Sequence, residues 1–404
     1  MNISFFISQK ILSQKNKRLS GTVVKISVLS IALGISILII SFAISEGFAD
    51  NIREKVIGFG SHIEVTHLNN NTSYENDPIE KIDLQQLTSI YNVSKVQFFA
   101  TKAGIVQGEE DIEGVLFKGV DYEDSMPFFS QHLVKGRLPK ANDSAVCDEI
   151  LISQSLANKL NADTATRLPA FFVQKPVRQR MFKVVGVYNT GFSTFDKSLI
   201  ICDLRQIQKL NQWTQNQVGG AEILLNDFNK IDTSNTLINN ALPYNFAAYS
   251  IIERYRDIFE WIELFKQNVL ILIILITIIA AVSLISTQFI FTLEHITTIG
   301  ILKTLGCNYA KIGNIFVFVL LKILALGLII GNVAGLLLCF VQSKWHIIRL
   351  NPENYYVSYV PIDVQILHVL LINAGAILLS ILILILPSYW VSNKIKTVDA
   401  LRMD

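Results

Sequence analysis

The chain has 404 residues and a formal net charge of +2, and 51% of its residues are hydrophobic while only 17% are charged. Soluble proteins carry about 25% charged residues, so this composition excludes an ordinary soluble protein. Four stretches nearly free of charge are each long enough to cross a bilayer core of about 30 Å as a helix. We therefore predict a polytopic membrane protein.

The N-terminal residues 1–25 carry five basic side chains and no acidic one. This pattern predicts a cytoplasmic amphipathic segment on the inner leaflet, because anionic lipid attracts basic residues. Residues 26–46 follow as transmembrane helix 1. A cleaved signal peptide is the alternative, but the 20 uncharged residues between Lys25 and Glu46 exceed the apolar core of about 7–15 residues in such peptides.

Residues 47–265 form a long insert with 21 basic and 27 acidic residues, a net charge of −6. This mildly acidic insert has no basic footprint for nucleic acid, so we expect no nucleic-acid partner. Apolar residues at helical spacing predict an amphipathic stalk at each end of the insert. Cys147 and Cys202 are either two buried thiols or one disulfide bridge, and their spacing does not decide between these alternatives.

Between the two stalks the sequence predicts a mixed α/β domain. Alternating or continuous apolar runs of four to nine residues are typical of strands, and longer amphipathic runs are typical of helices. Strand-like runs occupy 62–67, 93–101, 115–120, 182–187, 199–202 and 222–225, and helical patches occupy 150–160 and 204–210.

The second half of the chain alternates apolar stretches with short polar segments. Basic residues gather in 1–25, 294–311 and 392–404, which predicts cytoplasmic termini and a periplasmic insert. The predicted elements are transmembrane helix 2 (266–293), a cytoplasmic loop (294–311), transmembrane helix 3 (312–343), a short periplasmic loop (344–363), transmembrane helix 4 (364–391) and a cytoplasmic tail (392–404). The predicted fold is an α-helical membrane protein with four transmembrane helices, one plus three, and a large mixed α/β extracytoplasmic domain inserted between the first and second.

Two features mark transmembrane helix 3. Gly327, Gly331 and Gly335 repeat every four residues, and such a ridge of small residues predicts a face for close helix packing. Lys322 either extends to the inner membrane surface or forms a buried functional charge, and the first is favoured because no span contains an acidic partner.

No motif in the sequence predicts catalysis. The chain contains no phosphate loop of the form Gly-x-x-x-x-Gly-Lys-Ser/Thr, and no His-Glu-x-x-His, Gly-x-Ser-x-Gly or Cys-x-x-Cys motif. His62 and His67 lie five residues apart on a predicted strand, hence on opposite faces, which argues against a shared metal ion. We expect no enzymatic site, metal or cofactor, and if the protein moves cargo, another polypeptide supplies the energy.

The segment 293–307 reads Leu-Glu-His-Ile-Thr-Thr-Ile-Gly-Ile-Leu-Lys-Thr-Leu-Gly-Cys. It resembles the cytoplasmic motif of the lipoprotein-releasing (LolC/LolE) and MacB/FtsX-like permeases of ABC exporters. The resemblance covers nearly the whole chain, with a MacB-like periplasmic core domain in the insert and an FtsX-like permease domain over about 268–400. His295 departs from the Arg or Lys that this family has there. Further matching stretches follow in the same order at 32–35, 47–48, 57–63, 351–357, 360–362, 386–388 and 398–402.

The resemblance implies that the loop after transmembrane helix 2 is a coupling helix. It would sit in a groove of a separate cytoplasmic ABC ATPase dimer, which would bind the ATP. Ile299, Leu302 and Leu305 form an apolar ridge that suits such a contact. The alternative is an interfacial helix that only seals the loop. The candidate coupling residues are Glu294, His295, Ile299, Gly300, Leu302, Lys303, Leu305 and Gly306.

The resemblance also implies that a lipid-bearing substrate enters between the first two transmembrane helices. Each helix offers an uncharged face of bulky residues that could contact acyl chains, although such residues could equally face bulk lipid. The candidate cavity residues are Val28, Ile31, Ile35, Leu38 and Phe42 on the first helix and Leu270, Ile274, Ile278 and Val282 on the second.

In lipoprotein-releasing systems, a hook on the outer domain of one permease subunit captures a periplasmic carrier. Segment 171–181 lies where that hook would be, and exposed aromatic residues with a basic flank would suit docking. The equal alternative is an ordinary β-hairpin with a charged tip. The candidate hook residues are Phe172, Gln174, Pro176, Val177, Arg178 and Met181.

Together these features predict a bacterial inner-membrane permease subunit of an ATP-driven exporter that releases lipoproteins toward the outer membrane. The expected partners are the ATPase dimer, a second permease subunit (identical or paralogous), the lipoprotein substrate, a periplasmic lipoprotein carrier and membrane lipid. One alternative is a MacB-like permease for a peptide, toxin or drug. The other is an FtsX-like regulator that transmits force to a cell-wall hydrolase, and the 219-residue insert argues against it because such regulators have a smaller outer domain.

Overall fold

The computed structural model describes residues 18–70, 77–109, 111–122, 126–140, 146–307 and 309–394. Most of the predicted N-terminal amphipathic segment and of the C-terminal tail therefore lies outside the described residues. The chain divides into two compact units. We call them the helical unit, which contains Met1–Ala49, Ile262–Ile348 and Val360–Asp404, and the sheet unit, which contains Asp50–Trp261 and Arg349–Tyr359.

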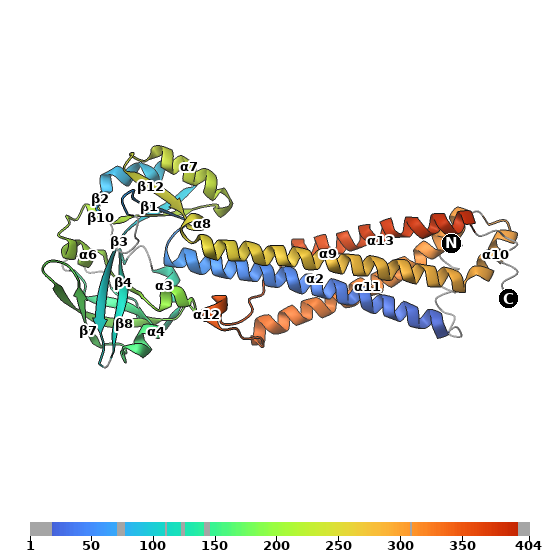
Figure 1. The fold of residues 1–404 in the computed structure, drawn as a ribbon, viewed down its shortest axis with the longest axis horizontal. Coiled ribbons are helices and arrows are strands. Elements are labelled where there is room, and N and C mark those ends of the chain that lie inside the picture. The colour runs from blue at the N-terminus through green and yellow to red at the C-terminus, as the bar shows by residue number, and fades with distance from the viewer. Residues whose placement is uncertain are drawn as a thin grey trace. The chain divides into compact units, whose positions relative to one another are not determined.

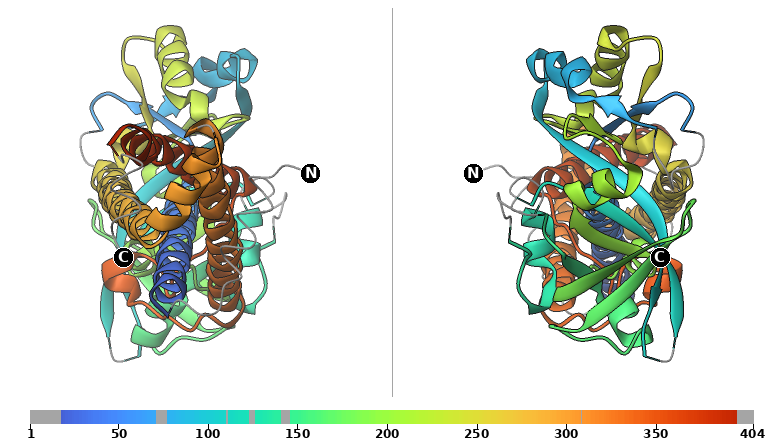
Figure 2. Two further views of the ribbon diagram at one scale, coloured as in Figure 1. Left: turned by 90° about the vertical axis from the view of Figure 1, so that its right-hand side faces the viewer. Right: turned by 90° about the vertical axis from the view of Figure 1, so that its left-hand side faces the viewer.

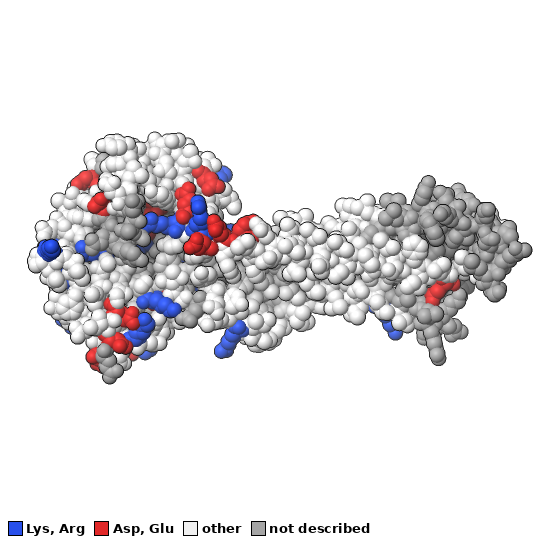
Figure 3. Space-filling model, in the orientation of Figure 1, with Lys and Arg blue, Asp and Glu red and all other residues white. Residues whose placement is uncertain are grey.

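Long apolar helices make up the helical unit, because a helix satisfies its own backbone hydrogen bonds where water is absent (Figure 1). The helices are α2 (Arg18–Phe59), α9 (Arg256–Glu294), the short α10 (Ile296–Thr304), α11 (Tyr309–Trp345) and α13 (Ile366–Lys394). By length and composition, α2, α9 and α11 can each cross a membrane, while the apolar stretch found in the described part of α13 is the shorter Ile366–Leu382. Charged side chains gather over the sheet unit, and the described surface of the long helices is mostly uncharged (Figure 3).

The helical unit is held together by close contact between α2 and α11. A Cβ placed on Gly327 would lie 2.7 Å from the side chain of Ile31, and one on Gly331 would lie 2.8 Å from the carbonyl oxygen of Ala32. At Gly335 the nearest atom of α2 would lie 3.1 Å away. The predicted glycine ridge thus faces α2, and at Gly327 and Gly331 a larger residue would force the helices apart.

The sheet unit is built on a large twisted sheet (Figure 2). This mixed sheet has ten strands in the order β12-β1-β11-β3-β4-β9-β6-β8-β5, and β7 pairs with β3 and β8. Its strands are β1 (Ile63–His67), β3 (Val93–Gln107), β4 (Ile112–Val120), β5 (Leu133–Gly136), β6 (Glu149–Ser153), β7 (Arg167–Phe172), β8 (Arg178–Tyr188), β9 (Leu199–Asp203), β11 (Gly220–Leu225) and β12 (Phe246–Ser250). The pairs β4–β9 and β6–β8 are parallel, and the others are antiparallel. A small second sheet pairs β2 (Ile79–Glu80) with β10 (Gln217–Val218).

Short helices connect these strands, so the predicted mixed α/β character of the insert is confirmed. They are η1 (Lys81–Ser89), α3 (Pro127–Gln131), α4 (Gln154–Lys159), α5 (Ser193–Asp196), α6 (Leu204–Asn211), η2 (Phe228–Lys230), α7 (Ile231–Ala241) and α8 (Ile251–Arg254). The helical patch predicted over 150–160 is wrong in its first part, which is strand β6. A short buried apolar run fits either structure, and the helix starts only where the Ser153 hydroxyl accepts a hydrogen bond from the Leu156 amide at 3.0 Å.

The two predicted stalks differ in structure. Helix α2 continues without a break through the first stalk, where Ile52 and Val56 are fully buried. The second stalk is not one helix. A capping box of Ser250 and Glu253 starts α8, the helical dihedral angles are interrupted at Tyr255, and α9 follows.

The chain between α11 and α13 contributes residues Arg349–Tyr359 to the sheet unit, which the sequence did not predict. This segment contains α12 (Pro352–Tyr355). The ring of Tyr356 stacks on Phe192 with centroids 5.3 Å apart and meets Trp261 edge-on at 6.1 Å. Because Val357 is also buried, the segment is an integral part of the sheet unit.

Candidate functional site

An apolar cavity of about 390 Å³ lies among the long helices of the helical unit. This volume falls within the range of about 300–1,000 Å³ typical of ligand pockets. None of the lining side chains is an acid, a lysine or an arginine, and the polar ones are Thr277, His368 and Ser380. The cavity therefore suits an uncharged, mainly aliphatic ligand.

Helix α2 presents to this cavity the face that its sequence pattern indicated. Ile31, Ile35, Leu38 and Phe42 all line the cavity. Val28 does not, and its carbonyl oxygen instead lies 3.4 Å from where a Cβ on Gly327 would be.

The face predicted for α9 does not line this cavity. Leu270, Ile274, Ile278 and Val282 are 53–58% exposed and do not line the cavity. The physical reason is that large branched residues lie on several sides of this helix, whereas the small Ala280 and the polar Thr277 mark the side that lines the cavity. The residues of α9 that line the cavity are Ile273, Ile276, Thr277, Ala280 and Leu284.

Two polar pairs fix the helices around the cavity. Asn332 of α11 and Asn373 of α13 exchange side-chain amide hydrogen bonds of 2.7 and 2.9 Å. Ser27 of α2 and Thr287 of α9 share a hydroxyl hydrogen bond. Such hydrogen bonds between helices contribute modestly to the stability of helix packing in an apolar medium. They also favour one rotation of each helix about its axis. Lys322 lies half-buried on α11.

The predicted coupling residues lie around α10. Glu294 ends α9, His295 is buried between the two helices, and Gly300 is buried within α10. Leu305 is 77% exposed, and Gly306 follows it with a φ of +79° that ends the helical segment. The side chains of Ile299, Leu302 and Lys303 lie outside the described part of the structure.

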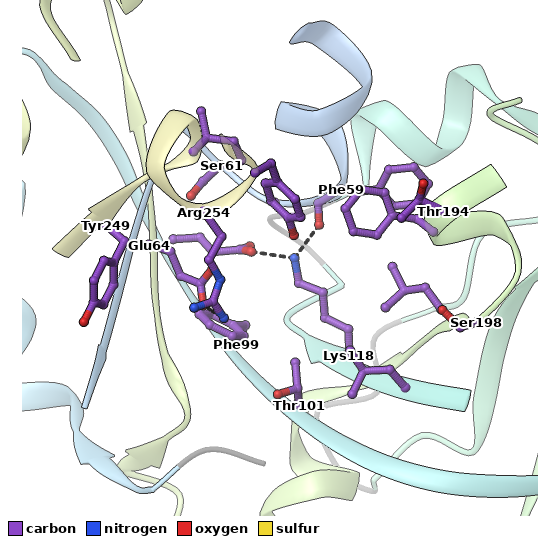
Figure 4. A pocket seen from close by; sticks show the side chains of 17 residues that line it. Phe59, Ser61, Glu64, Phe99, Thr101, Lys118, Thr194, Ser198, Tyr249 and Arg254 are labelled. Carbon is purple, nitrogen blue, oxygen red and sulfur yellow. Dashed lines mark hydrogen bonds and ion pairs between the residues drawn. The ribbon is translucent and has the colours of Figure 1, made fainter. Parts of the chain in front are cut away.

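A second cavity, of about 300 Å³, lies in the sheet unit and is lined by charged side chains (Figure 4). The ammonium of Lys118 on β4 lies 2.5 Å from a carboxylate oxygen of Glu222 on β11. It also donates a 2.6 Å hydrogen bond to the carbonyl oxygen of Phe59, at the end of α2. Glu64 on β1 lies 3.5 Å from the guanidinium of Arg254. Lys118 thus satisfies a terminal helix carbonyl and links α2 to the sheet.

The two carboxylates in this cavity are direct cross-strand neighbours, since Glu64 pairs with Glu222 in the β1–β11 register. Like charges directly opposite each other destabilise a sheet unless they are compensated. Burial raises the pKa of Glu64, Arg254 opposes the shift, and the nearby Glu222 adds to it. Burial also raises the pKa of the Tyr255 phenol. Sequence reasoning missed this network, although Glu222 is the single charge of β11 and Lys118 lies in the apolar second half of β4.

The predicted hook residues lie on the β7–β8 hairpin. Phe172 is fully buried, with its ring 5.1 Å from that of Phe117, so its prediction as an exposed docking residue is wrong. The alternation of the strand places it in the core. Gln174 and Arg178 donate hydrogen bonds to carbonyl oxygens of α6, at 3.2 and 3.1 Å. Pro176 is exposed, as are Val177 and Met181, at 65% and 45%.

Cys147 and Cys202 are both free thiols. Within the described ranges, no group of three or more His, Cys, Asp or Glu side chains is arranged to hold a metal ion. Neither cavity therefore offers a metal site among the residues that the structure describes.

Comparison with known proteins gives two family matches. The model of the MacB-like periplasmic core domain matches residues 26–240, and that of the FtsX-like permease C-terminal region matches residues 270–394. The lipoprotein-releasing system transmembrane protein LolC of Neisseria meningitidis is 25% identical over 414 residues, covering 97% of each chain. LolE of Haemophilus influenzae, which carries the same system name, is 24% identical over 413 residues and covers 96% of each chain. The periplasmic region of MacB from Actinobacillus actinomycetemcomitans, a solved structure, is 13% identical, with a TM-score of 0.35 over 51% of this chain and 97% of that one.

Proposed function

Because the chain belongs to the ABC permeases of the lipoprotein-releasing and MacB/FtsX-like family, we propose that it releases lipoproteins from the bacterial inner membrane for transfer to the outer membrane. The two named relatives, which it matches over nearly their whole length, support this choice of cargo. The ATP would be bound and hydrolysed by a separate ATPase dimer, and a second permease subunit would complete the membrane channel.

The observation that carries the proposal is the apolar cavity of the helical unit. A triacylated anchor does not leave a bilayer unaided, because each buried CH₂ contributes about 0.8 kcal/mol. Along α2 the cavity extends from Ile31 to Phe42, which is about 16 Å at a rise of ~1.5 Å per residue. One leaflet of the ~30 Å hydrocarbon core is about 15 Å thick, so acyl chains would fit the length of the cavity.

The proposed topology follows from the same assignment. Helices α2, α9, α11 and α13 would be the four spans, with both termini in the cytoplasm and the sheet unit in the periplasm. The positive charge of the short cytoplasmic segments supports this orientation. The exposed Leu305 beside α10 would enter the ATPase groove, and the exposed side of the β7–β8 hairpin would meet a periplasmic lipoprotein carrier.

A photo-crosslinker in the cavity tests the proposal. Placed at Ile35, in the complete complex, it should capture a lipoprotein when ATP is absent and lose it when ATP is added. The matched control is the same crosslinker at Ile274, which is 53% exposed on another face of α9 and should capture phospholipid in both conditions. Capture of phospholipid alone at Ile35 would contradict lipoprotein release and favour a MacB-like permease with another cargo.

A further inference from the structure

His368 occupies one end of the apolar cavity, in the first turn of α13. Its ring stacks on that of Phe42, with centroids 5.4 Å apart and an angle of 23° between the planes. Of the two other polar lining residues, Ser380 already donates its hydroxyl to the carbonyl oxygen of Ala376 at 2.7 Å. Among the described residues, the ring of Phe42 is the contact that the structure records for the imidazole, and no hydrogen bond to either ring nitrogen is recorded.

His368 is half-buried, and an imidazole always carries at least one N–H donor, so its ring can offer a hydrogen bond at the end of the cavity. The stacking on Phe42 restricts the orientation of the ring, because rotation of the imidazole would separate the two aromatic planes. The cavity lining therefore combines a long aliphatic surface with one polar donor at its end. A ligand that matches both has an aliphatic chain joined to a hydrogen-bond acceptor.

We propose that His368 binds an ester carbonyl group of the lipoprotein anchor, donating a hydrogen bond from a ring N–H to the ester oxygen while an acyl chain fills the cavity. This inference rests on the proposed function and names the polar contact within that site. Its position supports the assignment. His368 lies four residues inside the predicted outer boundary of its span, about 6 Å along the helix, where acyl carbonyls lie next to the hydrocarbon core.

The experiment measures binding of a synthetic triacylated lipopeptide to the complete complex in nanodiscs, by its concentration-dependent crosslinking at Ile35. Two probes of equal chain length are compared, one with ester-linked and one with ether-linked chains. Loss of one neutral hydrogen bond should raise the half-saturating concentration of the ester probe about two- to tenfold in His368→Phe, which keeps the stacked ring. His368→Gln, which keeps an N–H donor, should remain within about twofold of the unmodified chain.

The ether probe distinguishes loss of the hydrogen bond from a change in the shape of the cavity. It should bind the unmodified chain more weakly than the ester probe by a similar factor, and His368→Phe should weaken it no further. Equal losses for both probes in His368→Phe, or no loss for either, would overturn the role of His368. An ester preference seen with diacyl phospholipid but not with lipopeptide would also overturn it. If the unmodified chain captures neither lipopeptide, the proposed function itself fails, which is a different result.

Discussion

The two cavities are of comparable size, about 390 Å³ in the helical unit and about 300 Å³ in the sheet unit, but their walls have opposite chemistry. The first is mostly aliphatic, and Thr277, His368 and Ser380 are its polar lining residues. The second encloses two acidic and two basic side chains, each of which requires a partner at a fixed distance. Changes of shape in the helical cavity should therefore cost less folding free energy than the removal of one charged partner from the sheet cavity.

The largest expected effect is the removal of Lys118. Lys118→Met leaves Glu222 buried without its counter-ion, which typically costs about 3–5 kcal/mol of folding free energy. The thermal unfolding of the detergent-purified full chain, followed by tryptophan fluorescence, should shift to a clearly lower temperature. The double variant Lys118→Met with Glu222→Leu should recover most of the loss, because an apolar pair removes the stranded charge.

The matched control for this prediction is Lys135→Met. Lys135 pairs with Asp163 at 3.0 Å, but both side chains are more than half exposed. Exposed pairs contribute little, so the unfolding temperature should hardly change. Equal shifts in Lys118→Met and Lys135→Met would show that the sheet cavity is no more demanding than the protein surface.

A smaller loss of folding free energy is expected in the helical unit. Two glycines allow the comparison, because one is packed against another helix and the other is not. Gly331→Ala would place a methyl group 2.8 Å from α2 and should cost about 1–3 kcal/mol, as overpacking does. Gly375→Ala should be nearly neutral, because no atom of another described segment lies within 4 Å of its added Cβ. The same thermal unfolding measurement compares the two variants. A loss at Gly375 as large as that at Gly331 would contradict an open cavity beside α13.

The smallest expected effect is a pH dependence of the sheet cavity. Since burial raises the pKa of Glu64 above its ordinary 4.5, the folded state holds this proton more tightly than the unfolded state. The stability that this proton contributes is present below pH 4.5 and is lost as the pH rises through the raised pKa of the folded state. Glu64→Gln should remove this part of the decline in stability. The measurement is the unfolding temperature of the unmodified chain and of the variant as a function of pH. Parallel curves would show that Glu64 titrates normally.

The sequence predicted one wall of the helical cavity and not the other. On α2 the small residues and the polar Ser36 break the apolar pattern, so Ile31, Ile35 and Leu38 stand out as a face. On α9 the prediction followed the large branched residues, whereas the polar Thr277 and the small Ala280 mark the face that lines the cavity. The order of short motifs along the chain nevertheless identified the family.

The sheet cavity could not be predicted, because its charges come from strands far apart in the chain. Glu64, Lys118 and Glu222 meet only through the strand order β1, β11, β3, β4, and strand alternation does not reveal that order. The prediction that Phe172 is exposed was wrong for a related reason. Its place next to a polar hairpin tip suggested exposure, but the alternation of side chains along β7 directs its ring inward to Phe117.

The assignment of Arg349–Tyr359 to the sheet unit has a consequence for the path of the chain. The backbone passes between the two units four times, at Ala49–Asp50, Trp261–Ile262, Ile348–Arg349 and Tyr359–Val360. The last two crossings enclose Arg349–Tyr359, so this segment is more than a connection between α11 and α13. The rings of Phe192 and Trp261 against Tyr356 make it part of the core of the sheet unit.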